Sequence, residues 1–311
     1  MNVGYALRRI AEKWDDPRWR RYQILDQFVG RIHPFIYWND GISVVDEDWD
    51  NLIVLDACRA DLFEEVADLD EFDGYRRVTS NASNTTPWTR KNFGGHSLGD
   101  IVYVTANPVT SKEAPNAFHE LREVWVDGFD PESCSILPEA VVEETLAARD
   151  DHGDKRLVAH FMQPHMPFVP RPDLVYRTHW RPGEVEGPEA DPPNNIWHAL
   201  ELSEATADEV REGYRENLEF VLDDAVSLAR QLPGRTVIMS DHGNMLGERT
   251  IPPIRVFGHP PGLSCPELVT VPWAVVESGD RPEIVDGGAH SQTEMGEQVI
   301  EERLHNLGYV G

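Results

Sequence analysis

The sequence N-L-I-V-L-D at residues 51–56 is a short apolar run that ends in an aspartate. A continuous apolar run of this length is typical of a strand buried on both faces of a parallel sheet. A second run, T-V-I-M-S at 236–240, is followed at once by Asp241 and His242. Ligands bind beyond the carboxyl ends of parallel strands. The two runs therefore predict two carboxylates and an imidazole at one edge of a sheet.

These three side chains suit a divalent cation, because carboxylate oxygen and imidazole nitrogen are common metal ligands. Each residue also has a structural reading. Asp56 alone could cap a helix, and Asp241 with His242 could form a turn with an exposed histidine. Taken together, the residues favour a metal site.

Strands and helices alternate through the middle of the chain. Further strands are predicted at 75–79, 100–105, 123–126, 156–162 and 269–276. Helices are predicted at 59–66, 138–149 and 207–232, and Thr206 with Glu209 forms a capping box for the last of them. The alternation predicts an α/β fold, a three-layer α/β/α sandwich with a largely parallel central sheet.

The chain divides into three parts. Residues 1–48 are expected to form a basic, helical N-terminal arm, 49–290 the main α/β domain, and 291–311 a C-terminal helix. Residues 170–205 begin with a proline-rich stretch that breaks the strand–helix rhythm. A long irregular insertion in a compact domain is usually a lid or a binding loop, so this segment is predicted to be lid-like.

The composition is strongly acidic. Among 311 residues, 28 are Lys or Arg and 55 are Asp or Glu, which gives a net charge of −27 with only four lysines. Such a chain repels itself in dilute salt, and concentrated salt screens that repulsion. We therefore expect a halophilic protein; an acidic enzyme from a low-salt environment is the alternative. Binding of nucleic acid is excluded, because its phosphates would meet like charge.

Residues 1–31 differ from the rest because they carry seven basic and four acidic residues, with apolar residues at helical spacing. One reading is two helices packed on the acidic surface of the domain. The other is a peripheral contact with a membrane surface or an anionic partner.

Three cysteines without paired spacing exclude a disulfide scaffold and a cysteine-based zinc cluster. No apolar run approaches the roughly 18 residues of a membrane span, and the first 30 residues lack the core of a signal peptide. We therefore expect a cytoplasmic protein that is at most peripheral to the membrane.

The segment S-N-T-T-P-W-T-R at 83–90 follows the strand predicted at 75–79. Pro87 favours the first turn of a helix at this point. A hydroxyl at the start of a helix faces free N–H groups and the positive end of the dipole, and a neighbouring cation would make it a nucleophile. The other reading is that Thr85 or Thr86 only caps the helix.

Two histidines lie in rigid loops at predicted strand ends. His165 belongs to H-F-M-Q-P-H-M-P at 160–167, and His259 belongs to F-G-H-P at 257–260. Single histidines are more often structural than catalytic. The proline and glycine neighbours at strand ends nevertheless favour a role in the site.

Five segments together resemble the alkaline phosphatase/sulfatase superfamily, in the form of a sulfatase-like hydrolase of haloarchaeal type. They are N-L-I-V-L-D-A-C-R-A-D, S-N-T-T-P-W, H-F-M-Q-P-H-M-P-F, S-D-H-G-N-M-L-G-E and F-G-H-P. The resemblance spans residues 51 to about 275. It implies an alkaline-phosphatase-like fold for the domain 49–290 and one divalent ion (Mn, Mg or Zn, with Ca also compatible). The implied ligands are Asp56, Thr85, Asp241 and His242.

The resemblance also implies roles for other residues. Thr85 would be the nucleophile, because the family pattern places a proline two positions after it, and His165 and His259 would contact the transferred group or the leaving group. Contact with the substrate is predicted for Asn84, Arg59, Arg90 and His160. Arg59 could instead pair with Asp61 within its own helix, and Asn84 could be a turn residue.

The resemblance has a departure that bears on the substrate. The frame T-T-P-W-T at 85–89 lacks the Cys or Ser that sulfatases of the main class convert to formylglycine, and the arginine is displaced to Arg90. A threonine nucleophile with this ligand set is more similar to the lipoteichoic-acid-synthase and phosphoethanolamine-transferase branches.

The sequence therefore predicts a metal-dependent hydrolase or phosphotransferase that acts on a small-molecule, glycan-linked or lipid-linked phosphate ester. One alternative is a sulfatase-like hydrolase of sulfated glycans. The other is a non-catalytic member of the fold that binds a glycan or a partner.

Overall fold

A computed structural model describes residues 41–175, 196–250, 255–260 and 262–290 of the chain. Most of the predicted N-terminal arm, the centre of the 170–205 insertion and the predicted C-terminal helix lie outside these residues. Residues 41–48, assigned above to the arm, lie against the domain, where Val44 is buried and donates its N–H to Asn92 Oδ1 at 3.1 Å.

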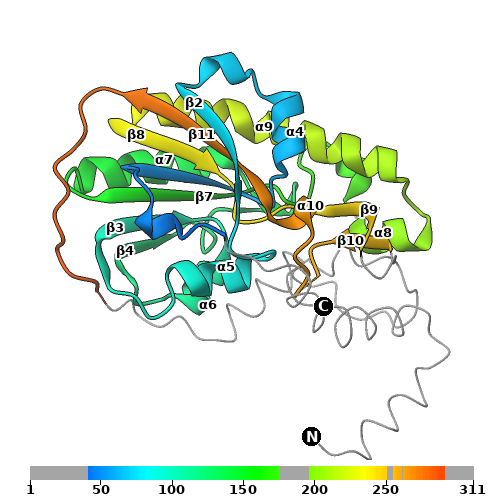
Figure 1. The fold of residues 1–311 in the computed structure, drawn as a ribbon, viewed down its shortest axis with the longest axis horizontal. Coiled ribbons are helices and arrows are strands. Elements are labelled where there is room, and N and C mark those ends of the chain that lie inside the picture. The colour runs from blue at the N-terminus through cyan, green and yellow to red at the C-terminus, as the bar shows by residue number, and fades with distance from the viewer. Residues whose placement is uncertain (1–40, 176–195, 251–254, 261, 291–311) are drawn as a thin grey trace, which may run out of the picture.

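The centre of the domain is a seven-stranded sheet with the order β2-β11-β8-β1-β7-β3-β4 (Figure 1). Five neighbouring strands are parallel: β8 (Gly234–Met239), β1 (Asn51–Asp56), β7 (Arg156–Pro164), β3 (Leu98–Thr105) and β4 (Phe118–Glu123). Strand β11 (Thr270–Ser278) runs antiparallel to both β8 and β2 (Gly74–Thr79). The predicted α/β class with a largely parallel sheet is confirmed.

Helices cover both faces of the sheet (Figure 1). One face carries α4 (Ala60–Val66), α7 (Pro138–Asp151) and α9 (Ala207–Gln231), and the other carries α5 (Thr85–Asn92) and α6 (Pro108–Glu113). Strand β1 shows why both faces are covered. Ile53 and Leu55 belong to one buried apolar cluster, and Leu52 and Val54 belong to another. All four are fully buried, so the sheet is the middle layer of an α/β/α sandwich.

Helix α9 forms as its sequence predicts. Thr206 accepts a hydrogen bond from the Glu209 N–H, and the Glu209 carboxylate accepts one from the Thr206 N–H, which completes the capping box. The smaller elements are α8 (Ile196–Leu202), α10 (Pro266–Val269), the hairpins β5 (Phe129–Asp130)–β6 (Ser135–Ile136) and β9 (Met245–Arg249)–β10 (Arg255–Gly258), and the 3₁₀ turns η2 (Val44–Asp46), η3 (Leu69–Glu71) and η4 (Pro172–Leu174).

The strand predicted at 123–126 is wrong. The strand in this region is β4, which ends at Glu123, and residues 124–127 form a turn. Trp125 is buried from that turn and its Nε1 donates to Ser111 Oγ at 3.1 Å. The apolar residues here reach the core from a turn. Their pattern in the sequence is the same as that of a short strand, so it does not distinguish the two structures. The helix predicted near Pro87 begins two residues earlier, at Thr85.

Residues 279–290, which we call the C-terminal strap, follow β11 and cross the amino ends of the parallel strands. Backbone N–H groups of the strap donate to Asp154 O, Gly99 O and Phe118 O at 2.9 to 3.0 Å. The strap therefore covers the sheet edge opposite the one where the predicted site residues lie. No helix in the described part of the chain is long and apolar enough to cross a bilayer.

Candidate active site

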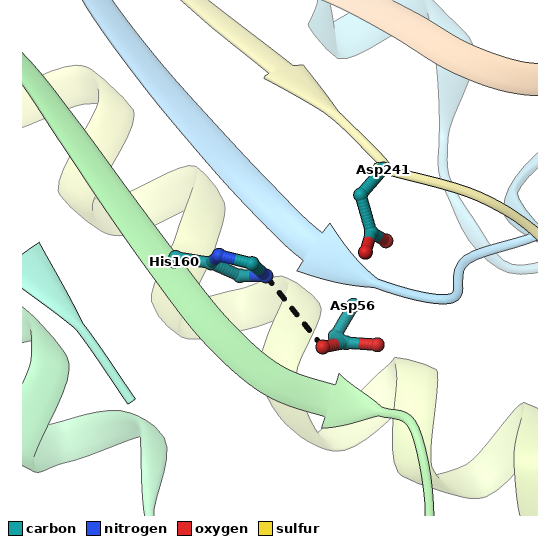
Figure 2. Close-up of side chains that lie close together, drawn as sticks. All are labelled: Asp56, His160 and Asp241. Atoms are coloured by element: carbon teal, nitrogen blue, oxygen red, sulfur yellow. Dashed lines mark ion pairs between the residues drawn. The ribbon is translucent and has the colours of Figure 1, made fainter. Parts of the chain in front are cut away.

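Asp56 and Asp241 lie together at the carboxyl ends of the neighbouring strands β1 and β8 (Figure 2). Both residues are fully buried. Two carboxylates in a dry interior repel each other and lose their hydration, a cost that a bound cation removes. The predicted meeting of these residues at one sheet edge is what the structure shows.

The Asp241 carboxylate is held on one side only. Its Oδ1 accepts hydrogen bonds from the backbone N–H groups of Ala57 and His242, both at 2.9 Å. Ala57 has φ 60°, in the left-handed region, which costs a non-glycine residue about 1–2 kcal/mol. That backbone turn aims the Ala57 N–H at Asp241. The other oxygen, Oδ2, has no hydrogen-bond donor among the described residues.

The Asp56 carboxylate is contacted from strands β3 and β7. Asn107, which follows β3 and caps α6, donates its Nδ2 hydrogen to Asp56 Oδ2 at 2.6 Å, and His160 Nε2 lies 3.6 Å from the same oxygen. Burial would raise the pKa of Asp56. The neighbouring imidazoles, first that of His160 and then those of His165 and His242, outweigh burial and lower the pKa below its ordinary value. The carboxyl group is therefore ionised at neutral pH.

His242 directs its Nε2 at the two carboxylates and Thr85. Its Nδ1 donates to the Gly243 carbonyl at 2.8 Å, which fixes the ring with Nε2 on the side of the carboxylates. That Nε2 lies 3.2 Å from Thr85 Oγ1, 3.4 Å from Asp241 Oδ2 and 3.9 Å from Asp56 Oδ1. The four predicted ligands thus come together in one buried cluster.

Gly243 is needed for this turn because the turn passes close to the backbone of Glu267. A Cβ at Gly243 would lie 2.2 Å from the Glu267 carbonyl oxygen, which is backbone and cannot move aside.

Thr85 is the first residue of α5, and the capping role belongs to Asn84. Asn84 Oδ1 accepts a hydrogen bond from the Thr86 N–H at 3.2 Å. The Thr85 hydroxyl is therefore not needed as a cap. It is fully buried and faces His242. In the first turn, Thr86 N–H donates to Asn84 Oδ1, Trp88 N–H donates to the Asn84 carbonyl and Pro87 has no N–H, so the Thr85 N–H and the positive end of the helix are what this turn offers an anion.

Asn84, His259 and His165 form a hydrogen-bonded chain next to the carboxylates. Asn84 Nδ2 donates to His259 Nδ1 at 2.8 Å, and the imidazole Nε2 atoms of His259 and His165 lie 3.1 Å apart. His165 Nδ1 donates to the Met166 carbonyl at 2.7 Å. One proton assignment satisfies all three contacts: His259 carries its proton on Nε2 and donates it to His165 Nε2.

Both of these histidines are neutral. Burial lowers the pKa of His165, and burial lowers the pKa of His259 well below its ordinary value. The His165 loop is fixed from α9, where Asn217 Nδ2 donates to the carbonyls of Pro164 and His165 at 3.1 Å.

Two of the other residues predicted to contact the substrate, Arg59 and Arg90, pair with acidic residues outside the buried cluster. Arg59 pairs with Asp61 at 2.7 Å and with Glu248 at 2.6 Å, and exposed Arg90 pairs with Glu113. Neither arginine makes a hydrogen bond or ion pair to the buried cluster within the described chain. Buried His160 lies beside Asp56, and ligand atoms of Asp56, His160 and Asp241 all fall within 4.8 Å of one another.

Sequence reasoning did not find three residues that contact the site: Asn107, Asn217 and Tyr103, whose hydroxyl lies 2.9 Å from His160 Nδ1. Asn107 had a usable signal, because it follows the predicted strand 100–105 and precedes a proline. Tyr103 and Asn217 lie within a strand and a long helix, where their polar groups give no pattern in the sequence.

No family model and no curated protein matches the chain. Among solved structures, it is similar to the soluble domain of lipooligosaccharide phosphoethanolamine transferase A from Neisseria meningitidis, with 15% identity and a TM-score of 0.46 over 72% of this chain and 75% of that one. A 2-O GAG sulfatase is similar at 14% identity and a TM-score of 0.48, over 73% of this chain and 63% of that one.

A third similar structure is a protein of the alkaline phosphatase superfamily from Vibrio parahaemolyticus. The identity is 12% and the TM-score 0.33, over 77% of this chain and 62% of that one.

Proposed function

We propose that the protein is a metal-dependent hydrolase or phosphotransferase that acts on a phosphate ester, with Thr85 as the nucleophile. One observation carries the proposal. The Nε2 of His242 lies within 3.9 Å of oxygens of Thr85, Asp241 and Asp56, which come from distant parts of the chain.

The donor set fits a divalent ion. Asp241 Oδ2 lacks a hydrogen-bond donor among the described residues, and two buried carboxylates need positive charge. We propose that Asp56, Thr85, Asp241 and His242 hold the ion. Mn²⁺, Mg²⁺ or Zn²⁺ suits three oxygens and one nitrogen. When bound, the ion supplies positive charge that lowers the pKa of a neighbouring alcohol and stabilises charge on a phosphoryl group.

The chain's own residues supply the rest of the reaction. Thr85 Oγ1 forms a bond to phosphorus as the bond to the leaving oxygen breaks, and the proton lost by Thr85 balances the one gained by the leaving alcohol. Water or an acceptor alcohol then takes the phosphoryl group and restores the hydroxyl. The Thr85 N–H at the start of α5 stabilises charge on an equatorial oxygen, and His259 and His165 contact the leaving group.

The described part of the 170–205 insertion supports its proposed role as a cover for the site. Trp197 on α8 packs on Gly258, where a Cβ would lie 3.1 Å from the indole ring. Gly258 precedes His259, so the insertion already contacts the loop that carries a proposed catalytic histidine.

Turnover of aryl esters tests the proposal. Wild type, Thr85→Ala and the neighbouring control Thr86→Ala are assayed in high salt with Mn²⁺, Mg²⁺ or Zn²⁺. The substrates are phosphate mono- and diesters and the sulfate ester of one phenol. Thr85→Ala is expected to lose on the order of 10⁴-fold or more in kcat, and Thr86→Ala to stay near wild type.

Full activity in Thr85→Ala overturns the assignment of the nucleophile. Preferred turnover of the sulfate ester supports a sulfuric ester hydrolase in its place. If wild type retains no metal and turns over no ester, the chain is a binding member of the fold.

A further inference from the structure

Three buried side chains form a line across neighbouring strands of the sheet. Tyr103 on β3 has its hydroxyl 2.9 Å from His160 Nδ1 on β7, and His160 Nε2 lies 3.6 Å from Asp56 Oδ2 on β1. All three residues are fully buried. Figure 2 shows the His160 ring directed at the Asp56 carboxylate at the end of β1.

The surroundings of His160 indicate which ring nitrogen carries the proton. Nε2 faces an ionised carboxylate and has no hydrogen-bond partner among the described residues. A proton on Nε2 points at that negative charge and is therefore favoured. Nδ1 must then accept, and the Tyr103 hydroxyl donates to it, as a phenol can.

The two oxygens of Asp56 have different neighbours. Oδ2 accepts from Asn107 and faces His160, and Oδ1 is the oxygen that lies 3.9 Å from His242 Nε2. One side of the carboxylate is thus held by Asn107 and faces His160, and the other side is directed at the remaining ligands of the proposed ion.

The ring of His160 has little freedom to turn. The indole of Trp88 meets it edge-on with ring centroids 6.1 Å apart, and Tyr103 itself packs against the rings of Phe93 and Phe118. A histidine fixed in this way sets the direction of its Nε2–H.

We propose that His160 is a positioning residue, oriented by Tyr103, that fixes the Asp56 carboxylate for metal binding. This inference rests on the metal site of the proposed function. A positioning role replaces the substrate contact expected for His160. It also differs from direct binding of the ion by His160, because a ligand His160 would need the lone pair on Nε2 and the proton on Nδ1. Partners that orient ligands in this way are each worth about 10–100-fold in metal affinity.

Metal affinity and coordination geometry test the inference together. The dissociation constants of Zn²⁺ and Co²⁺ are measured by competition with a chelating dye for wild type, Tyr103→Phe, His160→Gln and His160→Leu. His96→Gln is the matched control, because His96 is exposed. His160→Leu is expected to weaken affinity about 10–100-fold. His160→Gln should weaken it less, since its amide can still donate to Asp56. The Co²⁺ absorption bands should keep their shape.

A double-mutant cycle separates positioning from general damage to the core. Tyr103→Phe should weaken affinity in wild type and have little further effect in His160→Gln, because its partner Nδ1 is gone. The conservative variants keep the test valid if His160→Leu fails to fold.

Unchanged affinity in both His160→Gln and Tyr103→Phe overturns the inference. So does a Co²⁺ spectrum that changes shape in His160→Gln, because that would make His160 a ligand. If wild type binds the ions and Asp241→Asn does not, while the His160 variants match wild type, this inference fails and the proposed function stands. If wild type binds neither ion, both fail.

Discussion

Asn84 Nδ2 lies 2.8 Å from His259 Nδ1, and the other side of the same amide caps helix α5. One side chain thus joins the start of the helix that carries Thr85 to a histidine 175 positions later. The two contacts use different atoms, Nδ2 as a donor and Oδ1 as an acceptor, so substitutions can separate them.

Asn84→Asp should keep the cap and lose the contact to His259. A carboxylate still accepts from the Thr86 N–H but cannot donate to Nδ1. We expect thermal stability close to wild type and kcat/KM for an aryl phosphate lower by roughly 10²-fold. Asn84→Ala removes both contacts and should also cost about 1 kcal/mol of unfolding free energy. Equal activity in wild type and Asn84→Asp would show that His259 does not need this donor.

Removal of metal should lower the melting temperature of wild type and leave that of Asp241→Asn unchanged. An ion at about 100 times its Kd stabilises the folded state by about 2.7 kcal/mol, which raises Tm by about 5 °C or more. Asp241→Asn removes one of two buried carboxylates, so its metal-free form should melt no lower than metal-free wild type. Scanning calorimetry with and without a chelator measures both effects. A similar Tm rise with metal in both proteins would contradict the ligand assignment.

Thr206→Ala should destabilise the fold without affecting the site. Loss of the capping box of α9 is expected to cost about 1 kcal/mol in urea unfolding. Ser227→Ala, at an exposed position on the same helix, serves as the control and should change stability by less than about 0.5 kcal/mol. The metal Kd of both variants should equal that of wild type.

Concentrated KCl should raise the melting temperature. With a net charge of −27, repulsion within the folded protein falls as salt screens it. The measurement is Tm from low to molar KCl, with an equal osmolarity of sucrose as the control. A Tm that is highest in dilute buffer would favour the acidic enzyme from a low-salt environment.

The sequence was most informative where a residue pattern had a single structural explanation. The apolar run at 51–55 must be a strand buried on both faces, and an aspartate after it must lie at the sheet edge. The same reasoning located Asp241 and His242. It did not identify Asn84 as the helix cap, because Asn, Thr85 and Thr86 are all residues that can cap a helix.

Contacts between strands were beyond the reach of pattern reasoning. His160 was expected at the substrate, yet its side chain lies beside Asp56 because the register of β1 and β7 pairs Val54 with His160. Register is a property of two strands, and one strand's sequence does not reveal it. The case of Arg90 is similar. Its position around helix α5 directs the side chain to Glu113 and solvent.

The C-terminal strap has a consequence for how molecules meet one another. At one lateral boundary of the sheet, His290 of the strap donates to the first residue of β4; at the other, Ile42 bridges to Ser80 next to β2, which carries the charged residues Arg76 and Arg77. In the described part of the chain, a neighbouring segment thus occupies one end of each outer strand and shortens the row of backbone groups open to a foreign strand. This protection is independent of ionic strength, so it would still hinder fibril formation in brine that has screened the charge between copies.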